Sequence, residues 1–192
     1  MDPVELHRRA IAEFARRVKA VADDQWGAPT PCSDWDVRTV VNHVVSENLW
    51  TPPLLEGQTL DEVGDRFDGD VLGDDPKGAW KTSARRAVEA VHDAGAMERT
   101  THLSFGDVPG SEYTMQLFAD HLIHAWDVAR GAGGDDRLSP ELVDACAKWF
   151  SSVEGGYRAA GAIGPRPEIP PDADEQTALL AMFGRSADWS PE

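Results

Sequence analysis

Residues 118–131, FADHLIHAWDVARG, constrain the fold more than any other part of the chain. Their apolar members recur at the three- and four-residue spacing of an α-helix and cover a wide surface: Phe118, Leu122, Ile123, Ala125, Trp126, Val128 and Ala129. A helix with so wide an apolar surface has to pack against other elements on several sides. Asp120, His121 and His124 interrupt that surface. Because a buried carboxylate or imidazole needs a partner, these residues require an explanation beyond helix packing.

Further segments have the periodicity of amphipathic helices. They cover residues 3–23, 35–50, 76–94 and a stretch that begins at Pro140. Residues 51–75 form a long connection after the second helix, and no strong sheet signal is present. The sequence therefore predicts an all-α protein, a four-helix bundle with a long connection after its second helix and a short C-terminal extension. We expect the bundle to comprise residues 1–155, with 156–192 as an extension packing on it.

Local signals predict where these elements begin and end. Ser33 or Asp34 is expected to cap the second helix, and the prolines of TPPLLEG (51–57) are expected to end it. Segment 98–110 is expected to form a short hairpin or extended arm that turns at Gly106-Asp107. Ser111 is the expected N-cap of the helix that contains residues 118–131.

Charge and composition exclude several classes of function. Thirty-four acidic residues against eighteen basic ones give a formal charge of −16. This charge argues against nucleic acid or an anionic membrane as a partner, since both select for basic patches. The N-terminus has no apolar signal-peptide core, so we expect a cytoplasmic protein in which Cys32 and Cys146 are reduced thiols. Exposed tryptophans such as Trp189 leave a homodimer open.

The spacing of Asp120 and His124 suits a metal site. Side chains at i and i+4 leave the same face of a helix about one turn apart, so both heads can converge on one cation. His43, in the middle of the second helix, can supply a third ligand if the two helices are neighbours. Two imidazoles and one carboxylate suit Zn²⁺, with Ni²⁺ or Fe²⁺ as alternatives. Coordination would also remove the cost of burying an unpaired carboxylate.

Other polar residues leave alternatives open. His121 can be a fourth ligand, a partner that orients a ligand, or a base that faces substrate, although its side chain projects about 100° away from Asp120. Glu47 and Asp127 can orient ligand imidazoles or can be ordinary surface acids. Finally, all the inward histidines can be a satisfied polar core without any metal. The remaining histidines are expected at the surface or with satisfied partners: His7, His92 and His102.

Segments 32–50 and 118–133 resemble the DinB-like superfamily, and within it the metal-binding domain of the mycothiol-dependent maleylpyruvate isomerases. The resemblance implies a DinB-like bundle whose metal ligands are His43, Asp120 and His124, followed by the Trp126-Asp127 pair. The isomerases carry a glutamate where this chain has Asp120. They also carry a separate C-terminal domain, in place of which this chain has a short extension.

The resemblance implies a metal-dependent enzyme that uses a low-molecular-weight thiol such as mycothiol as cosubstrate. Metal coordination would deprotonate the thiol, and the thiolate would attack a small electrophile, by thiol transfer or thiol-assisted isomerisation. His121 is the expected base and Arg130 the expected partner of an anionic cosubstrate or substrate. The alternative is a metal- or thiol-binding module without turnover.

Overall fold

The computed structural model describes residues 1–32 and 34–191, and within them the chain is almost entirely helical. The helices are α1 (Pro3–Ala20), α2 (Val37–Leu55), α3 (Leu60–Val63), α4 (Pro76–Val91), α5 (Gly110–Gly131), α6 (Pro140–Ala159) and α7 (Glu175–Met182). The strands β1 (Thr100–Leu103) and β2 (Gly106–Pro109) form one antiparallel hairpin. The predicted all-α class is confirmed. Among the described residues, no helix combines the length and apolar character that crossing a bilayer requires.

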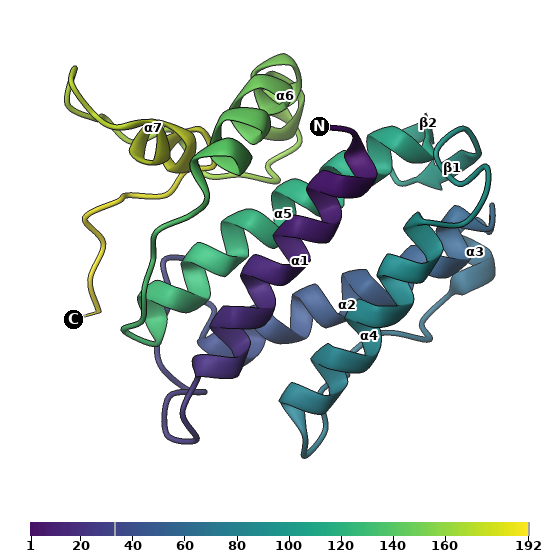
Figure 1. The fold of residues 1–192 in the computed structure, drawn as a ribbon, viewed down its shortest axis with the longest axis horizontal. Coiled ribbons are helices and arrows are strands. Elements are labelled where there is room, and N and C mark those ends of the chain that lie inside the picture. Colours follow the sequence, from purple (N-terminus) through teal and green to yellow (C-terminus); the bar gives the residue numbers. More distant parts are fainter. Residues whose placement is uncertain (33, 192) are drawn as a thin grey trace.

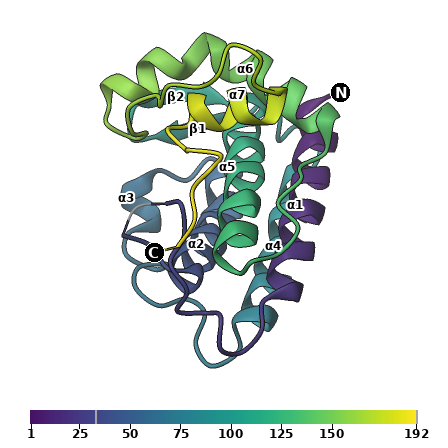
Figure 2. The ribbon, with the colours of Figure 1, turned by 90° about the vertical axis from the view of Figure 1, so that its left-hand side faces the viewer.

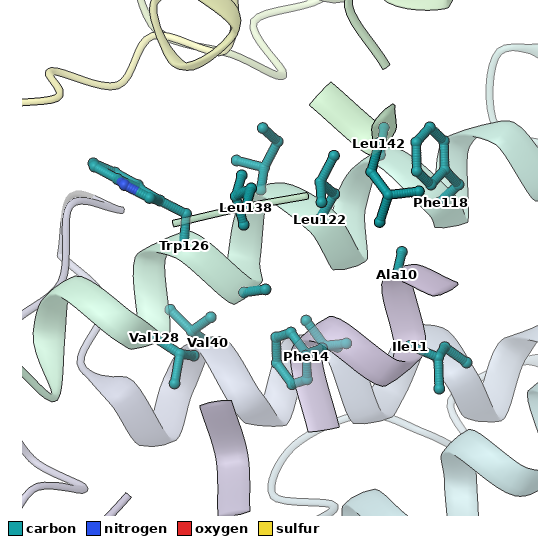
Figure 3. Packing of buried hydrophobic residues seen from close by; sticks show 14 of the residues in the cluster. Ala10, Ile11, Phe14, Val40, Phe118, Leu122, Trp126, Val128, Leu138 and Leu142 are labelled. Atoms are coloured by element: carbon teal, nitrogen blue, oxygen red, sulfur yellow. The ribbon is translucent and has the colours of Figure 1, made fainter. Parts of the chain in front are cut away.

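Helices α1, α2, α4 and α5 form the four-helix bundle (Figure 1). α5 packs against α1 and α2, and α4 closes the ring by contacting the same two helices. Figure 3 shows how the core is filled: Ala10 and Phe14 of α1 face α5, and Val40 of α2 lies beside Val128 of α5. α5 is the central element of the molecule, since apolar side chains are buried along nearly its whole length. Its wide apolar surface therefore has the neighbours that the sequence required.

The long connection after α2 folds back onto that helix. The Asn42 side chain donates to the Gly69 carbonyl at 2.9 Å and accepts from the Val71 amide at 2.9 Å. Arg38 pairs with Asp70 at 2.8 Å. These bonds order a Gly- and Asp-rich segment that buries little apolar surface of its own.

α6 and α7 pack on each other as a second layer that crosses one end of α5 (Figure 2). The Phe150 ring of α6 stacks on Phe183, which directly follows α7, with ring centroids 3.8 Å apart. Beyond α7 the chain turns back and runs beside α5 toward α2 (Figure 2).

The second helix departs from its predicted bounds. It runs to Leu55, with Pro52 and Pro53 inside it. Proline removes a backbone donor but its φ is already helical, so the last turn tolerates both residues at the cost of two hydrogen bonds. Asp36, whose side chain accepts from the Thr39 amide at 2.7 Å, caps the helix in place of Asp34. The other expected cap, Ser33, lies outside the described residues.

The hairpin also differs in detail. Leu103 pairs with Gly106, so the chain turns through Ser104 and Phe105 instead of Gly106-Asp107. α5 then begins at Gly110, one residue before the expected cap, and its N-cap Pro109 makes no side-chain hydrogen bond. A Cβ at Gly110 would lie 2.0 Å from the Ala96 carbonyl oxygen. This close approach of two backbones sets where α5 starts.

Candidate metal centre

A cavity of about 490 Å³ lies beside α5, between the bundle and the C-terminal layer. Its aromatic lining comes from both parts of the chain: Trp35, Tyr113, Trp149, Tyr157 and Phe183. Its polar lining includes His43 and Glu47 of α2, Asp120 and His124 of α5, and Arg185 from the segment after α7. Ionisable groups therefore meet in one largely apolar hollow, an arrangement typical of ligand sites.

His43, Asp120 and His124 converge at the wall of this cavity. Asp120 Oδ1 lies 3.3 Å from His43 Nε2 and 3.4 Å from His124 Nε2. One ligand atom from each of the three residues lies within 4.8 Å of the other two. Trp35 covers the pair of imidazoles, with ring centroids 5.1 Å from His43 and 6.0 Å from His124. The helix packing thus brings together the three residues expected as metal ligands.

These distances are compatible with a cation shared by the three residues. A hydrogen bond between an imidazole and a carboxylate is roughly 2.7–2.9 Å long, shorter than either separation here. A tetrahedral Zn²⁺ with bonds of about 2.0–2.1 Å holds its ligand atoms roughly 3.3–3.4 Å apart. The second oxygen, Asp120 Oδ2, is buried and has no hydrogen-bond partner among the described residues. The donor set and the unpartnered oxygen therefore fit a divalent metal.

The charges of the three groups support one another. Burial favours the neutral acid, but His43 and His124 outweigh it and hold the pKa of Asp120 well below its usual range. Burial lowers the pKa of His124, yet Asp120 and then Asp127 raise it to about 9. The pKa of His43 is raised in the same way, with Asp120 outweighing burial. An ionised Asp120 that attracts two cationic imidazoles would attract a metal cation for the same reason.

Asp127 orients the second imidazole. The His124 Nδ1–H donates to Asp127 Oδ2 at 2.9 Å, which leaves Nε2 free to face Asp120. Asp127 is completely buried, and Arg185 donates to it from Nε at 3.1 Å and from Nη2 at 2.9 Å. A carboxylate that fixes the tautomer of a histidine in this way is the usual companion of a metal-ligating imidazole. Of the two roles expected for Asp127, the structure favours orientation over that of a surface acid.

His121 lies on a different face of α5, inside the bundle core. It is completely buried, and its Nδ1–H donates to the Leu117 carbonyl at 2.6 Å. Its Nε2 faces the side-chain amide of Asn48, 3.0 Å from Oδ1. Burial lowers the pKa of His121, which favours the neutral ring. The expected role as a base facing substrate does not fit this position, because the core separates the ring from the cavity.

Arg130 does not line the cavity, where its expected role as an anion partner would require it. It pairs with Asp136 at 3.0 Å, donates to the Trp189 carbonyl, and lies with its guanidinium 5.9 Å from the Trp126 ring centroid. The cation that does line the cavity is Arg185. Sequence spacing missed Arg185 because it is far from α5 along the chain and follows a helix too short to signal its orientation.

Two other cavity residues were less clear from the sequence. Cys32 lines the cavity, where burial outweighs the opposing effect of Arg185 and raises the pKa of its thiol to about 11. The thiol is therefore protonated at neutral pH and a poor nucleophile. Glu47 also lines the cavity, and burial, followed by the charge of Asp120, raises its pKa. Glu47 lies one turn after His43 on the same helix, and this spacing is the sequence signal that indicates its place beside the cavity.

Comparisons with known proteins agree with this architecture. Residues 7–129 match the model of the family described as the mycothiol maleylpyruvate isomerase N-terminal domain. Two proteins of Mycobacterium tuberculosis, from strains H37Rv and CDC 1551 and both described as uncharacterized, are 34% identical to this chain. In each case the alignment covers 97% of this chain and 99% of the relative.

Solved structures show the same fold. The crystal structure of the mycothiol-dependent maleylpyruvate isomerase matches with a TM-score of 0.70 at 17% identity, over 97% of this chain and 89% of that one. A histidine-to-alanine mutant of that enzyme matches with a TM-score of 0.69 at 16% identity. The match therefore spans most of the isomerase chain. The predicted DinB-like bundle is confirmed, and the chain belongs to the mycothiol maleylpyruvate isomerase N-terminal domain family.

Proposed function

We propose that this protein is a metal-dependent enzyme that uses a low-molecular-weight thiol, such as mycothiol, on a small electrophilic substrate. The observation that carries the proposal is the convergence of His43, Asp120 and His124, with the unpartnered Asp120 Oδ2, at the wall of a cavity of about 490 Å³. Family membership supports the thiol, because the solved isomerase of this fold is described as mycothiol-dependent.

Each residue of the centre has a separate task. His43, Asp120 and His124 would hold a divalent metal, with Zn²⁺ favoured by the separation of the donor atoms. Asp127 fixes the tautomer of His124, and Trp35 covers the two imidazoles. When bound, the metal lowers the pKa of a coordinated thiol so that it ionises near neutral pH.

The cavity suits the thiol and the electrophile. Aromatic side chains line it, and a thiolate is a stronger nucleophile toward carbon where apolar walls displace its hydration. The sulfur would add to an electrophilic carbon–carbon double bond of the substrate, breaking its π bond and moving the electron pair onto the conjugated carbonyl oxygen. In thiol transfer the carbon–sulfur bond is kept and the adduct takes up a proton; in isomerisation the adduct rotates about the former double bond, the electron pair returns to re-form it, and the thiolate leaves. Glu47 lines the same cavity and is a candidate to exchange protons with the substrate.

Metal content tests the first half of the proposal. We expect about one zinc per chain by elemental analysis of the protein reconstituted with Zn²⁺, and loss of that zinc in His43→Ala and Asp120→Ala. His102→Ala is the matched control, since His102 is a surface histidine paired with Asp107 at 2.7 Å. A wild-type protein that retains no metal after reconstitution would contradict the proposal.

Thiol consumption tests the second half. Wild-type protein with Zn²⁺, a thiol and a panel of small electrophiles should consume thiol or isomerise substrate, and Asp120→Ala should lose this activity. Metal binding without turnover across the panel would instead support the alternative, a metal- or thiol-binding module.

A further inference from the structure

Arg185 connects the C-terminal segment to the metal centre. It follows α7, yet its guanidinium reaches Asp127 on α5 with two hydrogen bonds, Nε to Oδ1 at 3.1 Å and Nη2 to Oδ2 at 2.9 Å. Arg185 is itself largely buried and lines the cavity. The family match ends at residue 129, so Arg185 lies beyond the part of the chain that the match covers.

This geometry determines what Asp127 can do for His124. Both carboxylate oxygens of Asp127 accept from the planar guanidinium, which fixes the plane of the carboxylate. Oδ2 also accepts from His124 Nδ1–H at 2.9 Å, so the fixed carboxylate fixes the imidazole in turn. Asp127 is completely buried, and Arg185 therefore holds it in the orientation in which it meets His124.

Packing and backbone contacts hold the chain around Arg185 in place. Phe183 stacks on Phe150 of α6, and the Arg185 amide donates to the Leu180 carbonyl at 2.9 Å. Gly184 has φ +75°, and a Cβ there would lie 3.0 Å from the Gly164 carbonyl oxygen. The glycine permits the turn that directs Arg185 toward α5.

We propose that Arg185 is a positioning residue, which acts on the metal ligand His124 through Asp127 and makes the C-terminal segment part of the metal centre. This inference rests on the metal site proposed above.

A double-mutant cycle on Zn²⁺ affinity, measured by competition with a chelator, tests it. Asp127→Asn and Arg185→Gln should each weaken Zn²⁺ binding by roughly 10–100-fold, the usual effect of losing a partner that orients a ligand. The double variant should bind no more weakly than Asp127→Asn, because residues that act through one another are not additive. Arg137→Gln is the control, since Arg137 pairs with Asp174 at the surface of the same C-terminal region.

Two further measurements separate positioning from folding. The visible absorption spectrum of the Co²⁺-loaded protein should change in the same sense in both single variants, because it reports the geometry of the ligands. Arg185→Lys keeps the positive charge but cannot make both hydrogen bonds to Asp127. Its Zn²⁺ affinity should lie between those of wild type and Arg185→Gln. Arg185→Lys also provides a folded variant, checked by circular dichroism, if Arg185→Gln unfolds.

The outcomes are distinct. Additive losses in the double variant, or wild-type affinity and spectrum in a folded Arg185→Gln or Arg185→Lys, would overturn the role of Arg185 and leave the metal site standing. A wild-type protein that binds neither Zn²⁺ nor Co²⁺ would overturn the metal site and this inference together.

Discussion

Two faces of α5 carry histidines in opposite circumstances. On one face His121 is sealed in the bundle core, with hydrogen bonds to Leu117 and Asn48 at its two ring nitrogens. On the other, His124 borders the cavity, and the carboxylate that its Nε2 faces has an oxygen without a partner among the described residues. Burial alone therefore does not distinguish the histidine of the proposed metal site from the structural one. The distinguishing feature is a neighbouring carboxylate oxygen without a hydrogen-bond partner among the described residues, beside a cavity.

The two faces also shift the pKa values of their histidines in opposite directions. In the core, burial lowers the pKa of His121 and holds the pKa of the adjacent His7 well below its usual range. The two core rings meet edge to face with centroids 5.4 Å apart. At the cavity, Asp120 outweighs burial and raises the pKa values of His43 and His124. The core therefore favours neutral imidazoles and the cavity favours cations.

The largest expected difference between the faces is in metal binding. His124→Ala should lower Zn²⁺ affinity by more than the roughly 10–100-fold that follows loss of an orienting partner, because a ligand itself is removed. His121→Leu should retain about one zinc per chain. Elemental analysis and chelator competition on both variants measure this. Equal loss of zinc from the two would erase the distinction between the faces.

For the stability of the metal-free protein, the core variant His121→Leu should have a larger effect than the cavity variant His124→Ala. His121→Leu leaves the buried Asn48 amide without its ring partner and should lower the free energy of unfolding by about 1–3 kcal/mol. Adding Asn48→Leu should cost less than a second independent loss, since both partners are then apolar. Urea unfolding of the single and double variants measures this. An unchanged stability in His121→Leu would show that the core pair is not a structural contact.

On the cavity face, titration of His124 should lower the free energy of unfolding of the metal-free protein as pH rises. Folding raises the pKa of His124 to about 9, so its contribution is complete below the unfolded value of about 6.5 and is lost as pH rises through 9. Between these values the wild-type free energy of unfolding should fall by up to about 1.4 kcal/mol per pH unit relative to His124→Gln. Urea unfolding in chelator across this range measures the slope. Parallel profiles would contradict the raised pKa.

The core face should show the opposite dependence of stability on pH, because the pKa of His7 is lowered by burial. His7 is completely buried, its ring nitrogens lack partners among the described residues, and its pKa is lowered. The neutral ring is compatible with folding above the unfolded pKa of about 6.5, and stability is lost as pH falls below that value. His7→Leu should therefore flatten the decline in stability below about pH 6.5. A decline as steep as in wild type would assign the acid sensitivity to other groups.

His7 also shows where reasoning from the sequence failed. It was expected at the surface or with a satisfied partner, but it is buried against His121. The way α1 packs on α5 decides which of its side chains are buried. Local periodicity does not predict this for each single residue. Arg130 and Arg185 show the same limit, because which of two arginines reaches a cavity depends on chain segments that are distant in the sequence.

Helix boundaries were predictable where a side chain satisfies the helix end locally. α4 begins at Pro76 as predicted, and the Asp75 side chain accepts from the Gly78 amide at 2.9 Å. The boundaries failed where tertiary contacts decided them. α5 starts where Gly110 meets the backbone of Ala96. The division of the chain at residue 155 into bundle and extension stays a prediction.

The sequence by itself determined the helical class, the central position of residues 118–131, and the candidate ligand pair Asp120 and His124. These follow from periodicity and from the i,i+4 geometry of one helix, which are local properties of the chain. Only the tertiary structure decided that His43 joins them, that His121 faces the core, and that Arg185 reaches Asp127. The physical reason is that a helix fixes the angles between its own side chains, whereas the packing of other helices against it decides what each side chain meets.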